Sequence, residues 1–162
     1  MTMMTIQQFI RTLDQVARIE VPDAQAASLE EAGSVIDTYA KAQIGHYDLT
    51  PPAGFPSWPQ LADSTKKDRV REGFPENEPL LRTGELRDSI HHEVLDFDLA
   101  VVGSDSDIMV YQELGTETIP PRPVMGPAAV RMGPKVADMI GAAVVDALTS
   151  KPYRRKVDPD AL

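Results

Sequence analysis

The chain has 162 residues, no cysteine and a formal net charge of −9 at pH 7. The lack of cysteine excludes disulfide scaffolds, thiolate metal sites and cysteine nucleophiles, and the acidic balance argues against nonspecific binding to DNA phosphates. No apolar run approaches the ~20 residues that cross a bilayer and no signal peptide is recognisable, so we expect one structural domain over 1–150, made in a cytoplasm without a membrane partner.

Two helices are predicted within residues 1–49. The first has apolar residues at spacings of three and four, namely Ile6, Phe9, Ile10, Leu13 and Val16. We expect it to end near Glu20, because Pro22 disfavours helix in the residue before it. Asp23 is then the expected N-cap of a longer helix, whose apolar face is formed by Leu29, Ala32, Ile36, Tyr39, Ala40, Gln43 and Tyr47.

Residues 50–79 have the composition of an extended segment that follows the surface. They contain Pro51, Pro52, Pro56, Pro59, Pro75 and Pro79, which remove amide donors from regular structure. One short helix is expected inside it, at 60–72. Trp58 is the single tryptophan of the chain. It is either a packing anchor for this segment or an intersubunit hot spot, a role that tryptophan often has.

A family-like core is expected over residues 80–150. Thr83 is predicted to cap a helix in which Gly84 is the first residue and Leu86 and Ile90 share a face. Two short strands, 91–95 and 99–102, should pair as an antiparallel hairpin across the turn 96–98. Residues 108–114 favour a helix that Gly115 ends.

The segment 119–125 cannot be a central strand, because Pro120, Pro121 and Pro123 lack the amide donor that a sheet requires. We expect an edge strand or an extended arm. Arg122, held between prolines, has two interpretations: a bidentate bond to a neighbouring subunit, or an ion pair within the chain.

The last predicted helix runs from about Pro127 to Leu148, with Gly133-Pro134 expected to kink or split it. Its expected buried positions are Val130, Val136, Ala137, Ile140, Val144, Val145 and Leu148. Residues 151–162 read as a flexible basic tail, or as one that docks on an acidic neighbour. The predicted fold is α+β, with N-terminal helices, a small antiparallel sheet, an extended proline-rich arm and a long C-terminal helix.

An enzymatic interpretation has little support in the sequence. His91-His92-Glu93 with Asp96 and Asp98 offers metal ligands or a general base. Adjacent histidines on a strand point to opposite faces, however, and the second histidine of a zinc-binding helix is missing. We therefore predict no catalytic residue, no metal site and no cofactor.

Four short segments occur in a distinctive order. They are Trp58-Pro59-x-Leu61, the run 81–90 (LRTGELRDSI), the run 111–116 (YQELGT) and the run 119–125 (IPPRPVM). In this order and spacing the chain resembles the neck or tail-completion proteins of long-tailed bacteriophages and the virion-morphogenesis proteins of Mu-like phages. The resemblance spans roughly 58–148. The chain departs from it at Gln112, where an aromatic residue or histidine is common, and at Val124, where phenylalanine is usual.

The resemblance implies a structural virion protein, a subunit of a ring at the head–tail junction that completes the tail and joins it to the head. Its implied partners are further copies of itself, the head-closure or connector protein, and the tail terminator or tail-tube protein, with packaged DNA only passing through the channel. The implied location is the virion, assembled in the cytoplasm of the host bacterium. Interface candidates are Trp58, Leu81, Thr83, Gly84, Leu86, Tyr111, Leu114, Gly115, Thr116, Pro121, Arg122, Pro123 and Met125.

Other functions stay open at this point. Within the same class, the chain could be a tail terminator or another minor tail protein. A phage assembly chaperone that is missing from finished particles is an alternative of a different class. A hydrolase that uses His91 and His92 is the third.

Overall fold

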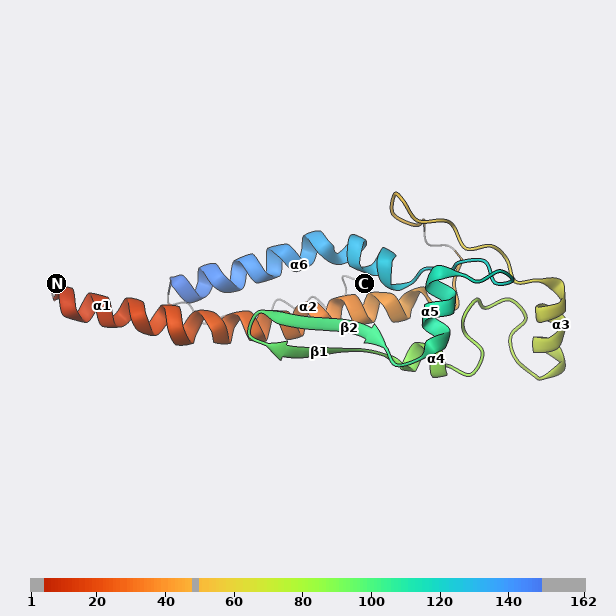
Figure 1. Ribbon diagram of the computed structural model, residues 1–162, viewed down its shortest axis with the longest axis horizontal. Helices are drawn as coiled ribbons and strands as arrows, with labels where there is room; N and C mark the ends of the chain where they lie inside the picture. The colour runs from red at the N-terminus through yellow and green to blue at the C-terminus, as the bar shows by residue number, and fades with distance from the viewer. Residues whose placement is uncertain (1–4, 48–49, 150–162) are drawn as a thin grey trace. The chain divides into compact units, whose positions relative to one another are not determined.

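The structure is a computed structural model that describes residues 5–47 and 50–149 (Figure 1). Its elements in chain order are α1 (Ile6–Gln15), a π-helical segment η1 (Val16–Glu20), α2 (Val21–Gln43), α3 (Asp63–Arg71), α4 (Glu85–Asp88), β1 (Ile90–Asp96), β2 (Leu99–Ser104), α5 (Asp107–Leu114) and α6 (Met125–Leu148). The strands form one two-stranded antiparallel sheet, so the α+β prediction is confirmed. None of the described helices has the length and apolarity to span a membrane.

The chain divides into two compact units. Unit 1 comprises Met1–Gly33, Glu93–Val101 and Lys135–Leu162, and unit 2 comprises Ser34–His92 and Val102–Pro134. α2, the hairpin and α6 each contribute residues to both units. The predicted basic tail, 151–162, lies outside the described residues.

The N-terminal helices do not separate at Pro22, and the prediction of a helix end near Glu20 is wrong. α1 continues through η1 into α2 (Figure 1), and Pro22 is the second residue of α2. The Val21 amide donates to the Val16 carbonyl, five residues back. Pro22 has no amide to donate to the preceding turn. The wider π-helical turn directly before it shifts the hydrogen-bond register at that point, so the helix continues through the proline. Asp23 is therefore an interior residue rather than an N-cap.

Unit 2 contains the hydrophobic core. Its buried members are Ala40, Ile44, Ile90, Met109, Val124 and Ala128, with partly buried Ile36, Tyr39, Trp58, Leu80, Leu81, Leu86 and Met125 packed against them. The apolar face predicted for the second helix is confirmed here, because Tyr39, Ala40 and Gln43 all point inward. Burying these side chains is the main favourable term for this unit.

A buried arginine organises the loop between α3 and α4. Arg69 is 4% exposed, and its guanidinium donates to the carbonyls of Pro75 (3.2 Å), Glu78 (2.8 Å) and Leu81. Burial lowers the pKa of Arg69. Its planar fork of donors thus satisfies carbonyls of a proline-containing loop that forms no sheet.

The segment 83–90 differs from its prediction. Gly84, not Thr83, is the N-cap of α4, with φ at +95°, a conformation that glycine adopts without strain. The Thr83 hydroxyl still accepts a long hydrogen bond from the Glu85 amide, at 3.4 Å. Ile90 begins β1 instead of ending the helix. The predicted hairpin is confirmed, with Phe97 and Asp98 in the turn.

The burial predicted for the last helix is confirmed only in part: Val136, Ile140 and Val144 are partly buried, whereas Ala137 is exposed. α6 runs unbroken through Gly133-Pro134, but Val130, Val145 and Leu148 are exposed. The fully buried alanines of α6 are instead Ala128 and Ala143, with Ala147 also buried. An amphipathic pattern marks an apolar stripe, but it does not say whether the chain itself covers that stripe.

Candidate subunit interface

The segment YQELGT builds a tight turn after α5. Gly115 ends the helix with φ at +75°, and its amide donates to the Tyr111 carbonyl. Thr116 closes the turn: its amide donates to the Ile119 carbonyl (2.8 Å), and its hydroxyl accepts from the amides of Thr118 and Ile119. A Cβ atom at position 115 would lie 3.0 Å from the Ile119 oxygen and from Pro121. Only glycine fits this turn without displacing its neighbours.

Glu113 caps the N-terminus of α6. One carboxylate oxygen accepts from the amides of Val124 (2.6 Å) and Met125 (3.0 Å), and the other accepts from Gly126 (2.8 Å). These amides have no partner within the helix, and the positive end of the helix dipole attracts the negative charge. A single side chain therefore fixes the start of α6 to the end of α5.

The proline-rich segment 119–125 is not a protruding arm, which corrects the expectation for Arg122. Arg122 is 6% exposed. Its amide donates to the Gln112 carbonyl (2.6 Å), and its guanidinium donates to the Pro59 carbonyl (3.1 Å). Among residues 5–47 and 50–149 it makes no ion pair, so the ion pair within the chain that the sequence suggested is not found there. Burial lowers the pKa of Arg122. Both its amide and its guanidinium donate to carbonyls of its own chain.

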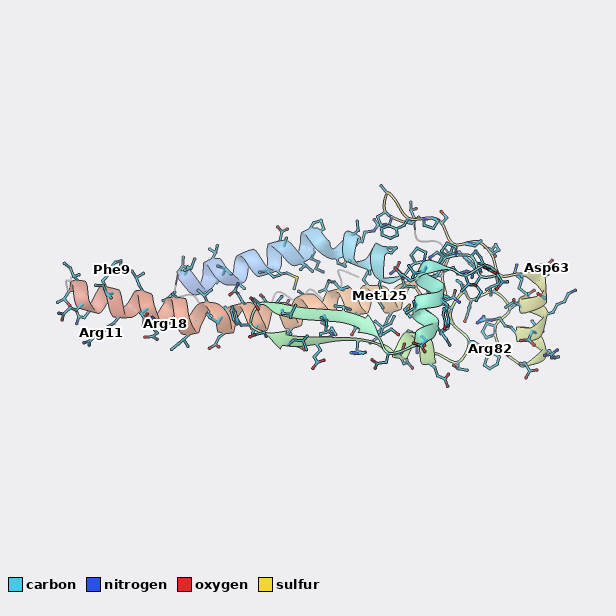
Figure 2. The ribbon with its side chains drawn as sticks, in the orientation of Figure 1. Phe9, Arg11, Arg18, Asp63, Arg82 and Met125 are labelled. Carbon is cyan, nitrogen blue, oxygen red and sulfur yellow. The ribbon has the colours of Figure 1, made fainter. Side chains whose placement is uncertain are left out.

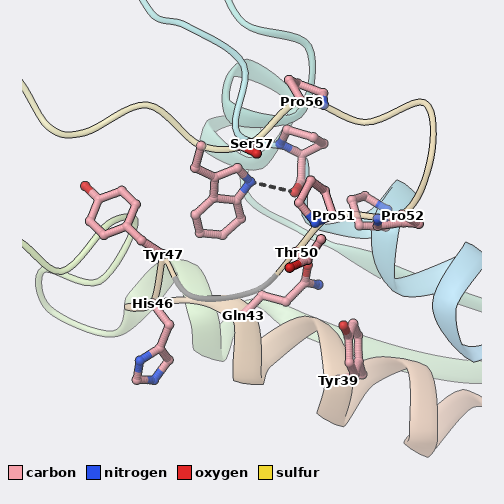
Figure 3. A pocket seen from close by; sticks show the side chains of 12 residues that line it. Tyr39, Gln43, His46, Tyr47, Thr50, Pro51, Pro52, Pro56 and Ser57 are labelled. Carbon is pink, nitrogen blue, oxygen red and sulfur yellow. Dashed lines mark hydrogen bonds between the residues drawn. The ribbon is translucent and has the colours of Figure 1, made fainter.

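Two more bonds hold this segment in the core. The Trp58 indole donates to the Pro123 carbonyl (3.0 Å), as the dashed line in Figure 3 shows. The Gln43 side chain donates to the Val124 carbonyl (3.0 Å). The pocket beside them in Figure 3 encloses about 20 Å³, which is room for about one water. Trp58 therefore serves as an anchor of the proline-rich segment rather than as a free surface group.

The outer face of α5 is apolar and uncovered. Ile108, Val110, Tyr111 and Leu114 are 54%, 53%, 51% and 75% exposed, whereas only Met109 of this helix is buried. Four large apolar side chains on eight residues are more than scattered surface hydrophobics, and such patches mark interaction sites. This set of four is termed the α5 face.

An open cavity of about 660 Å³ adjoins the α5 face through Ile108. Its wall includes residues of the LRTGEL segment, Thr83, Gly84 and Leu86, and the side chains of Gln112 and Arg122. Arg82 stands at the same cavity, 3.3 Å from Asp68 and with its guanidinium 4.9 Å from the centre of the Phe74 ring. The cavity has the size of a site for a few side chains of another protein.

The predicted interface residues thus fall into two groups. Thr83, Tyr111, Leu114, Thr116 and Pro121 are exposed and able to meet a partner. The inward or partly covered ones are Trp58, Leu81, Gly84, Leu86, Gly115, Arg122, Pro123 and Met125. Sequence reasoning missed Ile108 and Val110 as surface residues and Glu113 as a helix cap. For Glu113 no local signal was available, because it lies twelve residues before the first residue of α6, Met125.

The two adjacent histidines contact different carboxylates. His91 Nδ1 is 3.7 Å from an oxygen of Asp105, and His92 Nδ1 is 3.1 Å from an oxygen of Asp37. Within the part of the chain that the structure describes, no three metal-ligating side chains come together. His91 and His92 therefore do not share a carboxylate partner.

No family model, curated protein or solved structure matches the chain. The geometry of the α5–α6 junction and the α5 face is accordingly the basis for a functional proposal.

Proposed function

We propose that the protein is a structural subunit of a closed ring at the head–tail junction of a long-tailed phage, where it completes the tail and joins it to the head. The observation that carries the proposal is the α5 face, an uncovered apolar surface held on a rigid junction. The segments that resemble neck proteins build that junction, and the function is association rather than catalysis.

The junction supports this role because it fixes α5 in one orientation. Glu113 joins α5 to α6 through three hydrogen bonds. The turn at Gly115 is tightly packed, because a Cβ there would lie 3.0 Å from Ile119 and Pro121. A surface that must meet the same partner in every copy of a ring benefits from such preorganisation.

A closed ring requires a heterologous interface, in which one surface meets a different surface of the next copy. The α5 face offers the apolar side, and the adjoining cavity, with its mixture of leucines and arginines, offers a site for protruding side chains. Head-closure and tail-tube proteins are the proposed partners above and below the ring.

The experiment is electron microscopy and light scattering of the purified protein beside Leu114→Glu. Leu114 is 75% exposed, so the substitution should leave the fold intact, which circular dichroism checks. Rings in the wild type that are lost in Leu114→Glu support the proposal. Ser64→Glu, at an exposed position of α3, is the matched control and should leave rings unchanged.

Two outcomes contradict the proposal. Rings that Leu114→Glu leaves intact would remove the α5 face from the interface. A wild-type monomer that stays monomeric with the products of neighbouring genes, and that mass spectrometry does not find in finished particles, would favour the assembly chaperone. Detection elsewhere along the tail would favour a tail terminator or minor tail protein.

A further inference from the structure

Unit 1 has an inverted distribution of apolar side chains. Its buried hydrophobic residues, among those described, are Val16, Ala32, Ala143 and Ala147. Its exposed large hydrophobic residues are Ile6, Phe9, Ile10, Leu13, Ile19, Leu95, Phe97, Leu99, Val101, Val145 and Leu148. Three of the four buried residues are alanines, whereas the exposed residues are all large. The chain therefore leaves a large apolar surface of this unit uncovered, and such surfaces mark interaction sites.

α1 is the clearest example. None of its ten residues is buried, although Thr5 and Gln8 form a complete capping box that defines its start. Ile6, Phe9, Ile10 and Leu13 line one side, and Figure 2 shows Phe9 and Arg11 on opposite sides of the helix. Most helical stability in proteins comes from packing of an apolar face, and the apolar side of α1 packs on nothing within the described residues.

A second apolar surface lies at the hairpin tip, defined by Leu95, Phe97, Leu99 and Val101. These side chains are about half exposed. The tip is acidic, because residues 93–101 contain Glu93, Asp96 and Asp98 and no basic residue. Apolar surface ringed by carboxylates repels a second acidic surface and accepts a neutral one.

Charge decides which surface can meet the hairpin tip. α5 contains Asp107 and Glu113 and no basic residue. In residues 6–20, by contrast, Arg11 and Arg18 balance Asp14 and Glu20, in a chain whose net charge is −9. α1 is therefore the apolar surface that an acidic copy of the same chain can approach without repulsion. The balanced polar side also lacks the lysines and arginines of a helix that binds anionic lipid.

We propose that α1 of one copy packs on the hairpin tip of a second copy. The pairing is heterologous, and it rests on the proposed function only in placing the two surfaces around a ring. Each copy then donates one helix and accepts another, which covers the large apolar side chains that unit 1 leaves exposed.

The experiment measures mass by light scattering for three variants of the full chain. Phe9→Glu with Leu13→Glu alters the donor, Phe97→Glu with Leu99→Glu alters the acceptor, and both should have a lower mass than the wild type. Gln7→Ala with Thr12→Ala is the control. It changes two residues on other sides of α1 without altering the charge of the helix, and it should keep the wild-type mass. Circular dichroism verifies that each variant is folded.

A mixture of the donor and acceptor variants gives the sharpest test. The donor variant keeps an intact hairpin tip and the acceptor variant keeps an intact α1, so the mixture should have a higher mass than either variant alone. A mixture with no gain in mass overturns the heterologous pairing. A donor or acceptor variant with the wild-type mass, or a monomeric wild type, overturns the proposal.

The experiments distinguish a wrong α1 contact from a wrong ring function. Rings that persist in the Phe9→Glu and Leu13→Glu variant would refute the α1 contact and leave the ring subunit standing. Association that depends on α1 but yields open filaments instead of rings would keep the contact and refute the ring.

Discussion

At the scale of single residues, two positions fix the junction between α5 and α6. Glu113 accepts three backbone amides at the start of α6, and Gly115 turns the chain where a Cβ would meet Ile119 and Pro121. Both residues bond or pack within their own chain, and together they fix the position of α5 relative to the start of α6.

Replacing Glu113 by glutamine should destabilise the protein by about 1–2 kcal/mol, because the amide keeps one acceptor oxygen but loses the charge that favours the helix N-terminus. Urea denaturation followed by circular dichroism measures the change. Glu117→Gln, at an exposed position in the following loop, should be neutral within error. Equal effects of the two substitutions would show that the capping bonds contribute nothing.

Gly115→Ala should cost more stability than Gly54→Ala. Both glycines have positive φ, but a Cβ at Gly54 meets nothing within 4 Å, whereas one at Gly115 lies 3.0 Å from three atoms. Backbone strain is common to both variants, so the difference isolates the crowding, which we expect to be about 1–3 kcal/mol. Denaturation midpoints that coincide would contradict this account.

At the scale of elements, α6 is continuous at Gly133-Pro134, where its sequence predicts a kink or a split. Pro134 lies inside the helix, where it has no amide to donate and its ring crowds the preceding turn. The helix nevertheless persists, so packing on either side must offset the local penalty. The boundary between units 1 and 2 falls at this same residue, after Pro134.

Pro134→Ala should raise the thermal midpoint, because it restores a helical hydrogen bond and removes a penalty of up to about 3 kcal/mol. The position is exposed, so the smaller side chain leaves no cavity. Lys135→Ala, at the next exposed position, should change the midpoint little. A midpoint lowered by Pro134→Ala would mean that the proline is needed for the native path of α6.

At the scale of the whole molecule, the division between internal and external residues determines which substitutions probe assembly. Arg122 had the strongest sequence claim to an interface, yet it is buried and donates within its own chain. The α5 face and α1, which are uncovered, are the surfaces through which copies should meet. Substitutions of buried residues should therefore lower the stability of the fold, whereas substitutions of these uncovered residues should lower the mass of the assembly.

Arg122→Glu should unfold unit 2 rather than release folded subunits. It buries a carboxylate near the Pro59 carbonyl and removes a donor from it, a change of about 3–5 kcal/mol by analogy with broken buried ion pairs. Denaturation at several protein concentrations distinguishes the cases, because loss of stability that is independent of concentration indicates folding. Leu114→Glu should show the reverse, with a stable fold and a reduced mass.

The sequence by itself determined the elements whose signals are local. The hairpin, the end of α5 at Gly115, the apolar face of α2 and the α+β class all follow from spacing and turn residues, which act over a few positions. The sequence also predicted helix on both sides of Pro22, but it placed a break there because proline disfavours helix in the residue before it. The π-helical segment Val16–Glu20, which lets the helix continue, is not recognisable from residue types.

Only the tertiary structure decided which apolar and charged side chains the chain covers. Arg122 lies inside, where its guanidinium donates to the Pro59 carbonyl, which is distant in the sequence. Val130, Val145 and Leu148 are exposed, whereas Ala128, Ala143 and Ala147 are the buried residues of α6. Burial depends on what packs against an element from distant parts of the chain, and periodicity describes the element alone. The surfaces proposed for assembly, the α5 face and α1, became visible for that reason only when the fold showed them uncovered.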